Sequence, residues 1–440
     1  MKSRMVSLFL IVLAVMMVTS CGSDTSSTTR SFTTPTGTGY LRKSNTLWIL
    51  NLEGNYADMG RQYGALLKSE LATLDKELEK ILGQNFTVPS VVAAVKNQME
   101  PREDQLLTGM EQESGLSRYQ LERLNTSLFF IYDSGCSAFA ATGPQTESGF
   151  TVAGRNFDNP RGEFSRILRG NSILVIFNPK EQFTGNGAHR DNSVAIMTQI
   201  GWLYGLTTLN SKGIYLEYNN GMNSIRLPTN SAALLTQLST KRDGLHQNLY
   251  AAFDADTLEE VDARFSAPVA VATITQVADK SRIWHYERSP DFYTPEPTVY
   301  AKKINAGEAR GDQGYDNPPN MDIFTNHFFL TNWSNQRFDY TSADNDSGSR
   351  TFARLRNLQN LATQPGTTIN PTTMKEIMTT PLRADGTGGP FIPTELTSPD
   401  VTHFTSVTDI ANKIMHIYPY VDTLPDAPHW SVVDLTREFR

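Results

Sequence analysis

Cys136 is the residue of this chain best suited to covalent chemistry. It follows Gly135, whose unhindered carbonyl a thiol could attack, cleaving the chain between the two residues. Cleavage would free the α-amino group of Cys136, and the ordinary pKa of such a group, ~7.7–8, suits proton transfer near neutrality. The nucleophile would then carry its own base.

Two charged residues lie close to this cysteine in the predicted local fold. Strand-like runs flank a Gly/Pro-containing turn centred near Thr146, so a hairpin folded symmetrically about that turn places Cys136 opposite Asn156. Arg155 and Asp158 then flank the thiol. A guanidinium favours the thiolate, and a carboxylate can orient the proton acceptor. The alternative for this charged pair is a structural ion pair.

The cysteine count limits what Cys136 can be. The only other cysteine is Cys21, which the sequence around it assigns to another purpose, so no intramolecular disulfide is available in the mature chain. An isolated cysteine is ordinarily a small buried apolar residue. The ordered motifs described below favour the nucleophile instead.

Cys21 closes a predicted secretion signal. Residues 1–20 carry Lys2 and Arg4, then an apolar run too short for the ~20 residues that span a bilayer, then Thr19 and Ser20. This signal peptide ends in a sequence that resembles the bacterial lipobox, in which the cysteine sulfur is acylated and becomes the first mature residue. The alternative is an ordinary signal peptide with an incidental cysteine nearby. Lipidation predicts an exported lipoprotein at the cell membrane or outer membrane, facing the periplasm or the exterior.

The chain after Cys21 is predicted to be a tethered globular body. Residues 21–45 are rich in Ser and Thr and are predicted to form a flexible tether. The formal net charge of −7 and the lack of a long Lys/Arg cluster argue against nucleic acid as a partner. The partner expected from this part of the sequence is the membrane, through the lipid.

The pattern of apolar residues along the sequence changes near residue 130. Before it, apolar residues recur every three or four positions from Tyr56 to Ile81, which predicts an amphipathic helix capped by Asn55. Further helices are predicted in the same segment, at 88–99, 102–110 and 119–130. After Cys136, short runs rich in β-branched and aromatic residues predict a large sheet system of the α/β class. The predicted strands are 137–142, 150–155, 173–177, 194–199, 206–210, 214–218, 269–277, 282–287 and 328–331, with helices at 232–238, 257–265 and 351–361.

The motif around Cys136 resembles a known family. Cys-Ser-Ala-Phe at the head of a strand, followed after a hairpin by Gly-Arg-Asn-Phe-Asp, looks like the N-terminal nucleophile (Ntn) hydrolases of the choloylglycine hydrolase, penicillin V acylase and isopenicillin N acyltransferase-like group. These are hydrolases of linear amide C–N bonds. The resemblance extends over roughly residues 53–361.

Three later segments resemble this family in its own order. Segment 210–220 (NSKGIYLEYNN) is similar to one that ends in an oxyanion-hole asparagine; counting from Gly213 favours Asn220, with Asn219 one step away. Leu-Thr-Asn ending at Asn332 resembles the segment with a second active-site asparagine, and Ser-Gly-Ser-Arg ending at Arg350 resembles the one that supplies a distal arginine. Each asparagine could instead be an ordinary turn residue.

The position of Cys136 favours one branch of the family. Choloylglycine hydrolases expose their cysteine almost at the N-terminus, whereas here residues 21–135 precede it. This resembles the isopenicillin N acyltransferase-like branch, whose helical segment becomes a separate subunit after self-cleavage; Gly60 and Gly64 fit its glycine-marked start. The predicted organisation is therefore a helical segment, 46–135, followed by a catalytic region, 136–440, with the two fragments associated after cleavage.

The resemblance implies a four-layer αββα sandwich with two antiparallel sheets. It implies a self-processing amidohydrolase that cleaves a linear N-acyl amide through a thioester on Cys136, with Asn220 at the oxyanion, Arg155 and Asp158 at the nucleophile, and Asn332 and Arg350 around them. Two alternatives remain: an acyltransferase that passes the acyl group to an amine, and a non-catalytic surface lipoprotein that binds acylated ligands.

The sequence predicts neither a metal site nor a cofactor. The acidic run 344–349 superficially suggests a calcium loop, but its twelfth position is Leu355 where such loops have Glu. The histidines lack the two-histidine helical spacing of metal hydrolases, and no Gly-x-Ser-x-Gly elbow is present. Metal hydrolases and serine esterases are therefore disfavoured.

Overall fold

The computed structural model describes most of the chain after the predicted signal peptide. The described residues are 29–83, 88–130, 135–160, 162–182, 191–221, 231–240, 244–265, 269–288, 301–308, 316–328, 351–380, 400–420 and 429–440.

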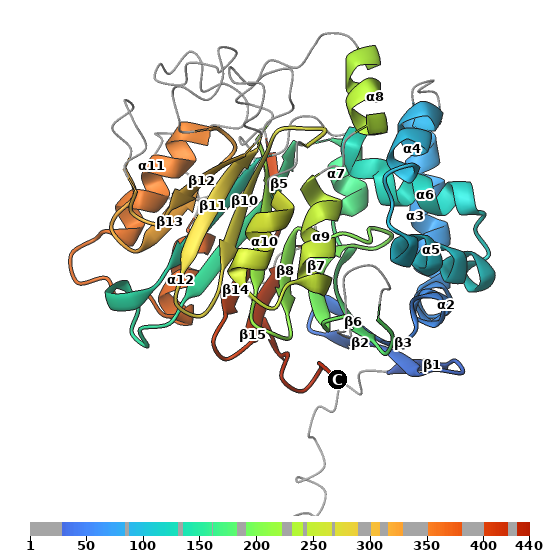
Figure 1. The fold of residues 1–440 in the computed structure, drawn as a ribbon, viewed down its shortest axis with the longest axis horizontal. Helices are drawn as coiled ribbons and strands as arrows, with labels where there is room; N and C mark the ends of the chain where they lie inside the picture. The colour runs from blue at the N-terminus through green and yellow to red at the C-terminus, as the bar shows by residue number, and fades with distance from the viewer. Residues whose placement is uncertain are drawn as a thin grey trace, which may run out of the picture.

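Two sheets form the centre of the molecule (Figure 1). The larger has the order β1-β2-β3-β6-β7-β8-β9-β10-β11-β12, and the smaller has the order β13-β4-β5-β14-β15-β16. The strands of the larger sheet are β1 (Arg30–Thr33), β2 (Thr38–Ser44), β3 (Leu47–Gly54), β6 (Ser172–Pro179), β7 (Val194–Gln199), β8 (Thr207–Asn210), β9 (Tyr215–Asn220), β10 (Thr273–Ala278), β11 (Ile283–Arg288) and β12 (Ala301–Asn305). Those of the smaller sheet are β4 (Cys136–Ala141), β5 (Val152–Pro160), β13 (Met321–Phe324), β14 (Asp400–Asp409), β15 (Ile414–Pro419) and β16 (Ser431–Asp434).

Helices cover the outer faces of both sheets. The N-terminal group comprises α2 (Tyr56–Leu66), α3 (Lys68–Leu82), α4 (Val88–Lys96), α5 (Pro101–Ser114) and α6 (Arg118–Thr126). Next come α7 (Glu163–Leu168), α8 (Ser231–Thr240), α9 (Gly244–Asp254) and α10 (Leu258–Phe265), and then α11 (Thr351–Ala362) and α12 (Pro371–Thr379). In Figure 1, α9 and α10 lie in front of the large sheet, with α11 and α12 beside the small one.

Three apolar clusters define the layers. The first joins the large sheet to the N-terminal helices, α9 and α10, for example through Val175 and Leu249. The second joins the small sheet to α11 and α12, for example through Phe139 and Met374. The third lies between the sheets, where Ile176 of β6 meets Phe157 of β5 in one cluster. The predicted αββα sandwich is confirmed, because each sheet has one face on its partner sheet and one on helices.

Three sequence predictions about the fold are wrong in part. The tether predicted for 21–45 ends by Arg30, because β1 and β2 occupy 30–33 and 38–44. The sheets are not wholly antiparallel, since β3 pairs with β6 in parallel. The single helix predicted from Tyr56 to Ile81 divides at Leu67, although Asn55 does cap it, accepting a 2.7 Å hydrogen bond from the backbone N–H of Asp58.

The segment after residue 361 matched no pattern in the sequence, yet it supplies half of the small sheet. Strands β14, β15 and β16 extend that sheet beyond β5. The chain end returns to the N-terminal strands, where Glu438 accepts hydrogen bonds from Arg42 (2.7 Å) and Asn51 (2.9 Å). The C-terminal segment is therefore part of the same folded unit as the two sheets.

Glycines set the close approach of α2 and α5. A methyl group added at Gly60 would lie 2.1 Å from the carbonyl oxygen of Leu106, and one at Gly109 would lie 2.0 Å from that of Ala57. Real side-chain carbons do not approach a backbone oxygen so closely. The glycine at position 60 is therefore explained by helix packing.

We expect Gly60→Ala to destabilise the protein by about 1–3 kcal/mol, because the helices must separate to admit the methyl group. Urea unfolding measures this loss. The control is Lys76→Ala on the exposed face of α3, expected to change stability by less than about 0.5 kcal/mol. Equal stability of Gly60→Ala and wild type would contradict the packing argument.

Candidate active site

The pairing of β4 with β5 decides which side chains face the thiol. Cys136 lies opposite Phe157, one residue from the predicted partner Asn156, so that prediction is wrong. Residues directly opposite in an antiparallel pair share a face. Ala138 lies opposite Arg155, so Cys136 and Arg155 point to the same side of the sheet. In the predicted register they would point to opposite sides.

Arg155 reaches the sulfur from this shared face. Its Nη2 lies 3.4 Å from Cys136 Sγ and donates a 2.7 Å hydrogen bond to the backbone carbonyl of Tyr218 in β9. The guanidinium is completely buried and lies 5.3 Å from the ring centre of Phe157 and 5.6 Å from that of Phe404. A full positive charge therefore stands beside the sulfur in surroundings that screen it poorly.

The ionisation of the thiol reflects opposing influences. Burial raises the pKa of Cys136, Arg155 lowers it, and the carboxylate of Asp158 raises it again. Burial wins in the intact chain, where Cys136 is 1% exposed. Water admitted by cleavage or substrate entry would reduce the desolvation and leave Arg155 to favour the thiolate.

The backbone of Cys136 is held by two residues that the sequence analysis did not select. Its N–H donates to Asn326 Oδ1 at 2.6 Å, and its carbonyl accepts a hydrogen bond from Arg354 Nη1. Arg354 Nη2 also donates to Asn326 Oδ1 at 2.8 Å, and Nη1 donates to Ser137 Oγ at 3.0 Å. Both residues are fully buried. They fix the nucleophilic residue from the helix side of the small sheet.

The peptide bond before Cys136 carries a preformed hydrogen bond. The backbone N–H of Asp158 donates to the carbonyl oxygen of Gly135 at 2.8 Å. This is the carbonyl that the thiol would attack. A donor at this oxygen polarises the carbonyl and stabilises the negative charge that develops on attack.

The Asp158 carboxylate lies on the same face as Arg354. Its Oδ1 accepts a 2.6 Å hydrogen bond from Thr402, and its Oδ2 lies 3.9 Å from Arg354 Nη1 with no hydrogen-bond partner in the described part of the chain. Burial raises the pKa of Asp158 to about 6 despite the two nearby arginines. The carboxyl group is thus poised to ionise when a new cation appears beside it.

The two adjacent asparagines at the end of β9 have different surroundings. Asn219 is fully buried and donates a 2.9 Å hydrogen bond from Nδ2 to the carbonyl of Thr325. Asn220 is 7% exposed, and its carbonyl accepts a 2.8 Å hydrogen bond from Asn326 Nδ2. Asn219 therefore anchors the turn that carries Asn326.

The structure thus brings together some of the predicted site residues. Cys136, Arg155 and Asp158 lie together, and Asn220 joins them through Asn326. Asn332 and Arg350 lie outside the described residues.

Asn326 and Arg354 each had a signal in the sequence. Asn326 ends a Thr-Asn pair six residues before the one selected, directly after the short apolar run of β13. Arg354 lies four residues after Arg350 in the sequence, and Thr351 at the start of α11 accepts a 3.0 Å hydrogen bond from the backbone N–H of Asn326. Thr-Asn occurs twice and arginine recurs four residues later, so the sequence alone did not show which asparagine follows a strand or which arginine lies within a helix.

The core between the sheets also contains a pair of stacked aromatic side chains. Trp202 and Tyr204 are at most 1% exposed and belong to the core between the sheets, stacked with ring centres 5.3 Å apart. Within the described ranges, no group of three or more His, Cys, Asp or Glu side chains is arranged to bind a metal. No described helix combines the length and apolar character that crossing a bilayer requires.

This chain is similar to known proteins in its three-dimensional structure. No protein-family model matches the chain. No curated protein sequence matches it either.

Three solved structures illustrate the similarity. The Caenorhabditis elegans N-acylethanolamine-hydrolyzing acid amidase ortholog is 14% identical with a TM-score of 0.39, over 62% of this chain and 93% of that one. A mutant conjugated bile acid hydrolase from Clostridium perfringens is 11% identical with a TM-score of 0.40, over 69% and 93%. Penicillin V acylase from Agrobacterium tumefaciens is 12% identical with a TM-score of 0.38, over 69% and 87%.

Proposed function

We propose that this protein is a self-processing cysteine amidohydrolase that cleaves a linear N-acyl amide. One observation carries the proposal: both polar atoms of the Gly135–Cys136 peptide bond are held by hydrogen bonds, and a buried arginine contacts the adjacent sulfur. Asp158 donates to its carbonyl, Asn326 accepts from its N–H, and Arg155 contacts the sulfur. A cysteine that only filled core volume would not require these polar contacts.

The first reaction is cleavage of the chain itself. The Cys136 sulfur attacks the carbonyl carbon of Gly135, and the oxyanion is held by the backbone N–H of Asp158. The C–N bond breaks, the thiol proton passes to the departing nitrogen, and a thioester joins Gly135 to Cys136. Water then hydrolyses the thioester, leaving a carboxylate on Gly135 and a free thiol and α-amine on Cys136.

The same contacts then position the new base. Asn326 Oδ1 accepts a hydrogen bond from the Cys136 nitrogen before cleavage and can keep one N–H of the amine afterwards. Asp158 Oδ2 is buried without a hydrogen-bond partner among the described residues, so a nearby ammonium would give its charge a partner. The amine takes the thiol proton as the substrate is attacked and returns it to the leaving amine.

Substrate cleavage needs an oxyanion donor besides the one used in processing. The N–H of Asp158 is directed at Gly135, whereas the Asn220 side chain lies at the end of the neighbouring strand β9. We assign Asn220 to the oxyanion of the added amide. The resulting acyl group on sulfur is released to water as a carboxylic acid.

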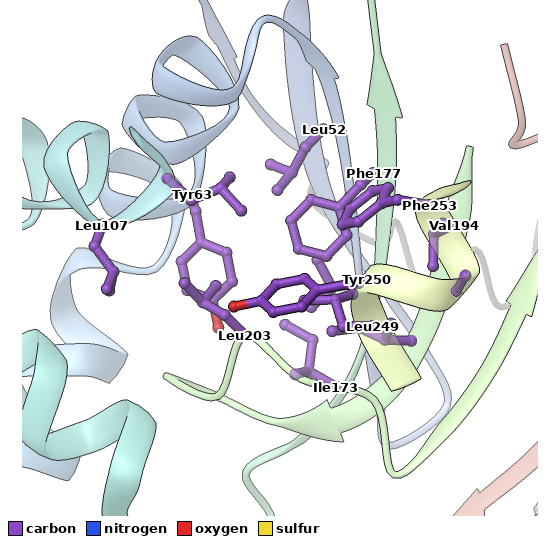
Figure 2. Packing of buried hydrophobic residues seen from close by; sticks show 14 of the residues in the cluster. Leu52, Tyr63, Leu107, Ile173, Phe177, Val194, Leu203, Leu249, Tyr250 and Phe253 are labelled. Carbon is purple, nitrogen blue, oxygen red and sulfur yellow. The ribbon is translucent and has the colours of Figure 1, made fainter. Parts of the chain in front are cut away.

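The N-terminal fragment is expected to remain bound after cleavage, because it completes the large sheet. Strand β3 belongs to the segment before Cys136, and it pairs with β6 along seven residue pairs from Trp48↔Ile173 to Gly54↔Pro179. Tyr63 of α2 and Leu107 of α5 lie in the same apolar cluster as Phe177 and Tyr250 (Figure 2). Separation would expose this cluster and a sheet edge.

Buried polar contacts made by Arg102 and Glu103 reinforce the association of the two segments. Arg102 of α5 donates 2.8 and 2.9 Å hydrogen bonds to the Asp254 carboxylate and a 3.1 Å one to Asp191. Beside it, Glu103 accepts a hydrogen bond from the Tyr250 hydroxyl and lies 2.9 Å from His246 Nε2. Asp191, Asp254, Tyr250 and His246 all belong to the segment after Cys136. Within the N-terminal segment, Arg102 also donates to Glu100 and Glu103 also accepts from Asn125. Parting the fragments would break the buried charge contacts between the two segments, which is strongly unfavourable.

Processing is the first test. Purified mature wild type should consist of fragments 21–135 and 136–440 that migrate together under native conditions and separate in denaturant. Cys136→Ala should remain one chain, because it lacks the nucleophile. Intact-mass measurement of both proteins decides the matter. An active wild-type protein in which Cys136 remains internal would contradict the mechanism.

The roles of the two asparagines give the second test. Asn220→Ala should still self-cleave, because the Gly135 carbonyl has its own backbone donor and the reaction is intramolecular. It should hydrolyse an added N-acyl amide about 10²–10³-fold more slowly in kcat, with KM little changed.

The matched control is Asn219→Ala, which removes the bond to the Thr325 carbonyl and should mainly reduce stability. Processed Asn220→Ala with full amidase activity would remove Asn220 from the site.

We also propose that Cys21 carries a lipid and anchors the protein. Strand β1 starts at Arg30, so the first strand of the fold follows Cys21 closely in the sequence. Gly22-Ser23 lacks the aspartate after the cysteine that inner-membrane retention usually shows, so in a Gram-negative cell we expect the outer membrane.

The anchor is tested by replacing Cys21 with serine. The variant should either appear in the soluble fraction or accumulate with its signal peptide attached, whereas wild type should partition into detergent. Mass spectrometry of the mature N-terminus gives the acyl mass directly. Unchanged detergent partitioning of Cys21→Ser would refute the anchor.

A further inference from the structure

The buried carboxyl group of Glu217 faces the arginine behind the thiol. Arg155 Nε lies 3.7 Å from Glu217 Oε1, and both side chains are completely buried. Arg155 comes from β5 of the small sheet and Glu217 from β9 of the large one, so the pair bridges the space between the sheets. The guanidinium therefore contacts the sulfur through Nη2, at 3.4 Å, and the carboxyl group through Nε.

The contact between Arg155 and Glu217 is electrostatic without being a full hydrogen bond. Arg155 Nε and Nη1 and Glu217 Oε1 have no hydrogen-bond partner among the described residues. The other carboxyl oxygen, Oε2, accepts a 2.7 Å hydrogen bond from Tyr215. The carboxyl group is therefore held in place from its own strand, while its interaction with the guanidinium depends on its charge.

We propose that Glu217 is a positioning residue whose proton controls how much of the Arg155 charge acts on the Cys136 sulfur. This rests on the proposed role of Cys136 as the nucleophile. When Glu217 holds its proton, the guanidinium is uncompensated and favours the thiolate. When Glu217 loses its proton, the carboxylate neutralises Arg155 and the thiol holds its own proton more tightly.

Several neighbouring groups set the pH range in which Glu217 loses its proton. Burial raises the pKa of Glu217 to about 8, while Arg155 and the Tyr215 hydrogen bond act to lower it. Asp322 of β13 also faces it and raises its pKa; that carboxylate accepts hydrogen bonds from Gln276 at 2.9 Å and contacts His285 at 2.8 Å. On the thiol side, Asp158 is the further charged group. A negative charge on either the thiol or the Glu217 carboxyl group therefore disfavours ionisation of the other.

Ionisation of Cys136 gives a readout that a purely structural Glu217 would not move. Thiolate absorbance is measured against pH in full-length protein, with the spectrum of Cys136→Ala subtracted to isolate this sulfur. Wild type should titrate over a broad pH range, because Glu217 ionises alongside it. Glu217→Gln should titrate as a single site with its midpoint lower by about one pH unit, a tenfold gain in thiolate below the midpoint.

Companion variants make the result specific. Glu217→Asp keeps a carboxyl group and should keep the broad titration. Tyr215→Phe removes the hydrogen bond that favours the Glu217 carboxylate, so it should shift the thiol midpoint in the same direction as Glu217→Gln, and it carries the test if that variant does not fold. The control is Glu122→Gln, a buried carboxyl group paired with Lys96 and Arg118 on α4 and α6. It should leave the thiol titration unchanged.

The outcome separates this inference from the proposed function. Thiol ionisation requires neither self-cleavage nor an amide substrate, so an unprocessed or inactive wild type would overturn the proposed function and leave the titration interpretable. A folded Glu217→Gln or Tyr215→Phe with the wild-type midpoint and breadth would overturn the role of Glu217.

Discussion

The site depends on the register of the hairpin formed by β4 and β5. With Cys136 opposite Phe157, the sulfur and the Arg155 guanidinium share the face between the sheets, and Ser137, Asn156 and Asp158 share the other. A slip of one residue would separate the thiol from its cation, since side chains alternate across a strand. The backbone of Cys136 is meanwhile clamped from the helix side by Asn326 and Arg354. The pairing of β4 with β5 therefore places the Cys136 sulfur among residues between the sheets and the Cys136 backbone among residues on the helix side.

This arrangement concentrates charge where water is excluded. Arg155 and Arg354 are fully buried on opposite faces of β4 and β5, and Glu217 and Asp158 lie near them at 3.7 and 3.9 Å. Burial raises the pKa of both carboxyl groups, to about 8 and about 6. Because neither pair has close ion-pair geometry, each carboxyl group responds to a charge that appears beside it. A new ammonium at Cys136 and a thiolate at its sulfur are such charges.

The sequence predicted the parts of the site that depend on local pattern. Cys136, Arg155 and Asp158 follow from one hairpin, and the strand 194–199 was predicted with the bounds it has in the structure. The hairpin register was missed by one residue, because a short 3₁₀ turn at Gly143–Gln145 replaces the symmetric turn that was assumed. Asn326 and Arg354 were missed because their role comes from contacts across about 190 and 218 residues of sequence. Strands β1 and β2 lie within the Ser/Thr-rich segment that was predicted to be a tether, and β3 has a distant second partner in β6.

The position of the cleavable bond follows from the same long-range contacts. The segment before Cys136 contributes β3 to the large sheet, and its Arg102 and Glu103 contact α9. This segment cannot dissociate without breaking the sheet. The segment after Cys136 contributes β4, which is paired on both sides by β13 and β5. The chain is therefore fixed in a sheet on either side of Gly135, and the Gly135–Cys136 bond lies beside the thiol. The proposed cleavage of this bond would remove no hydrogen-bonded strand pair, so both sheets would remain intact.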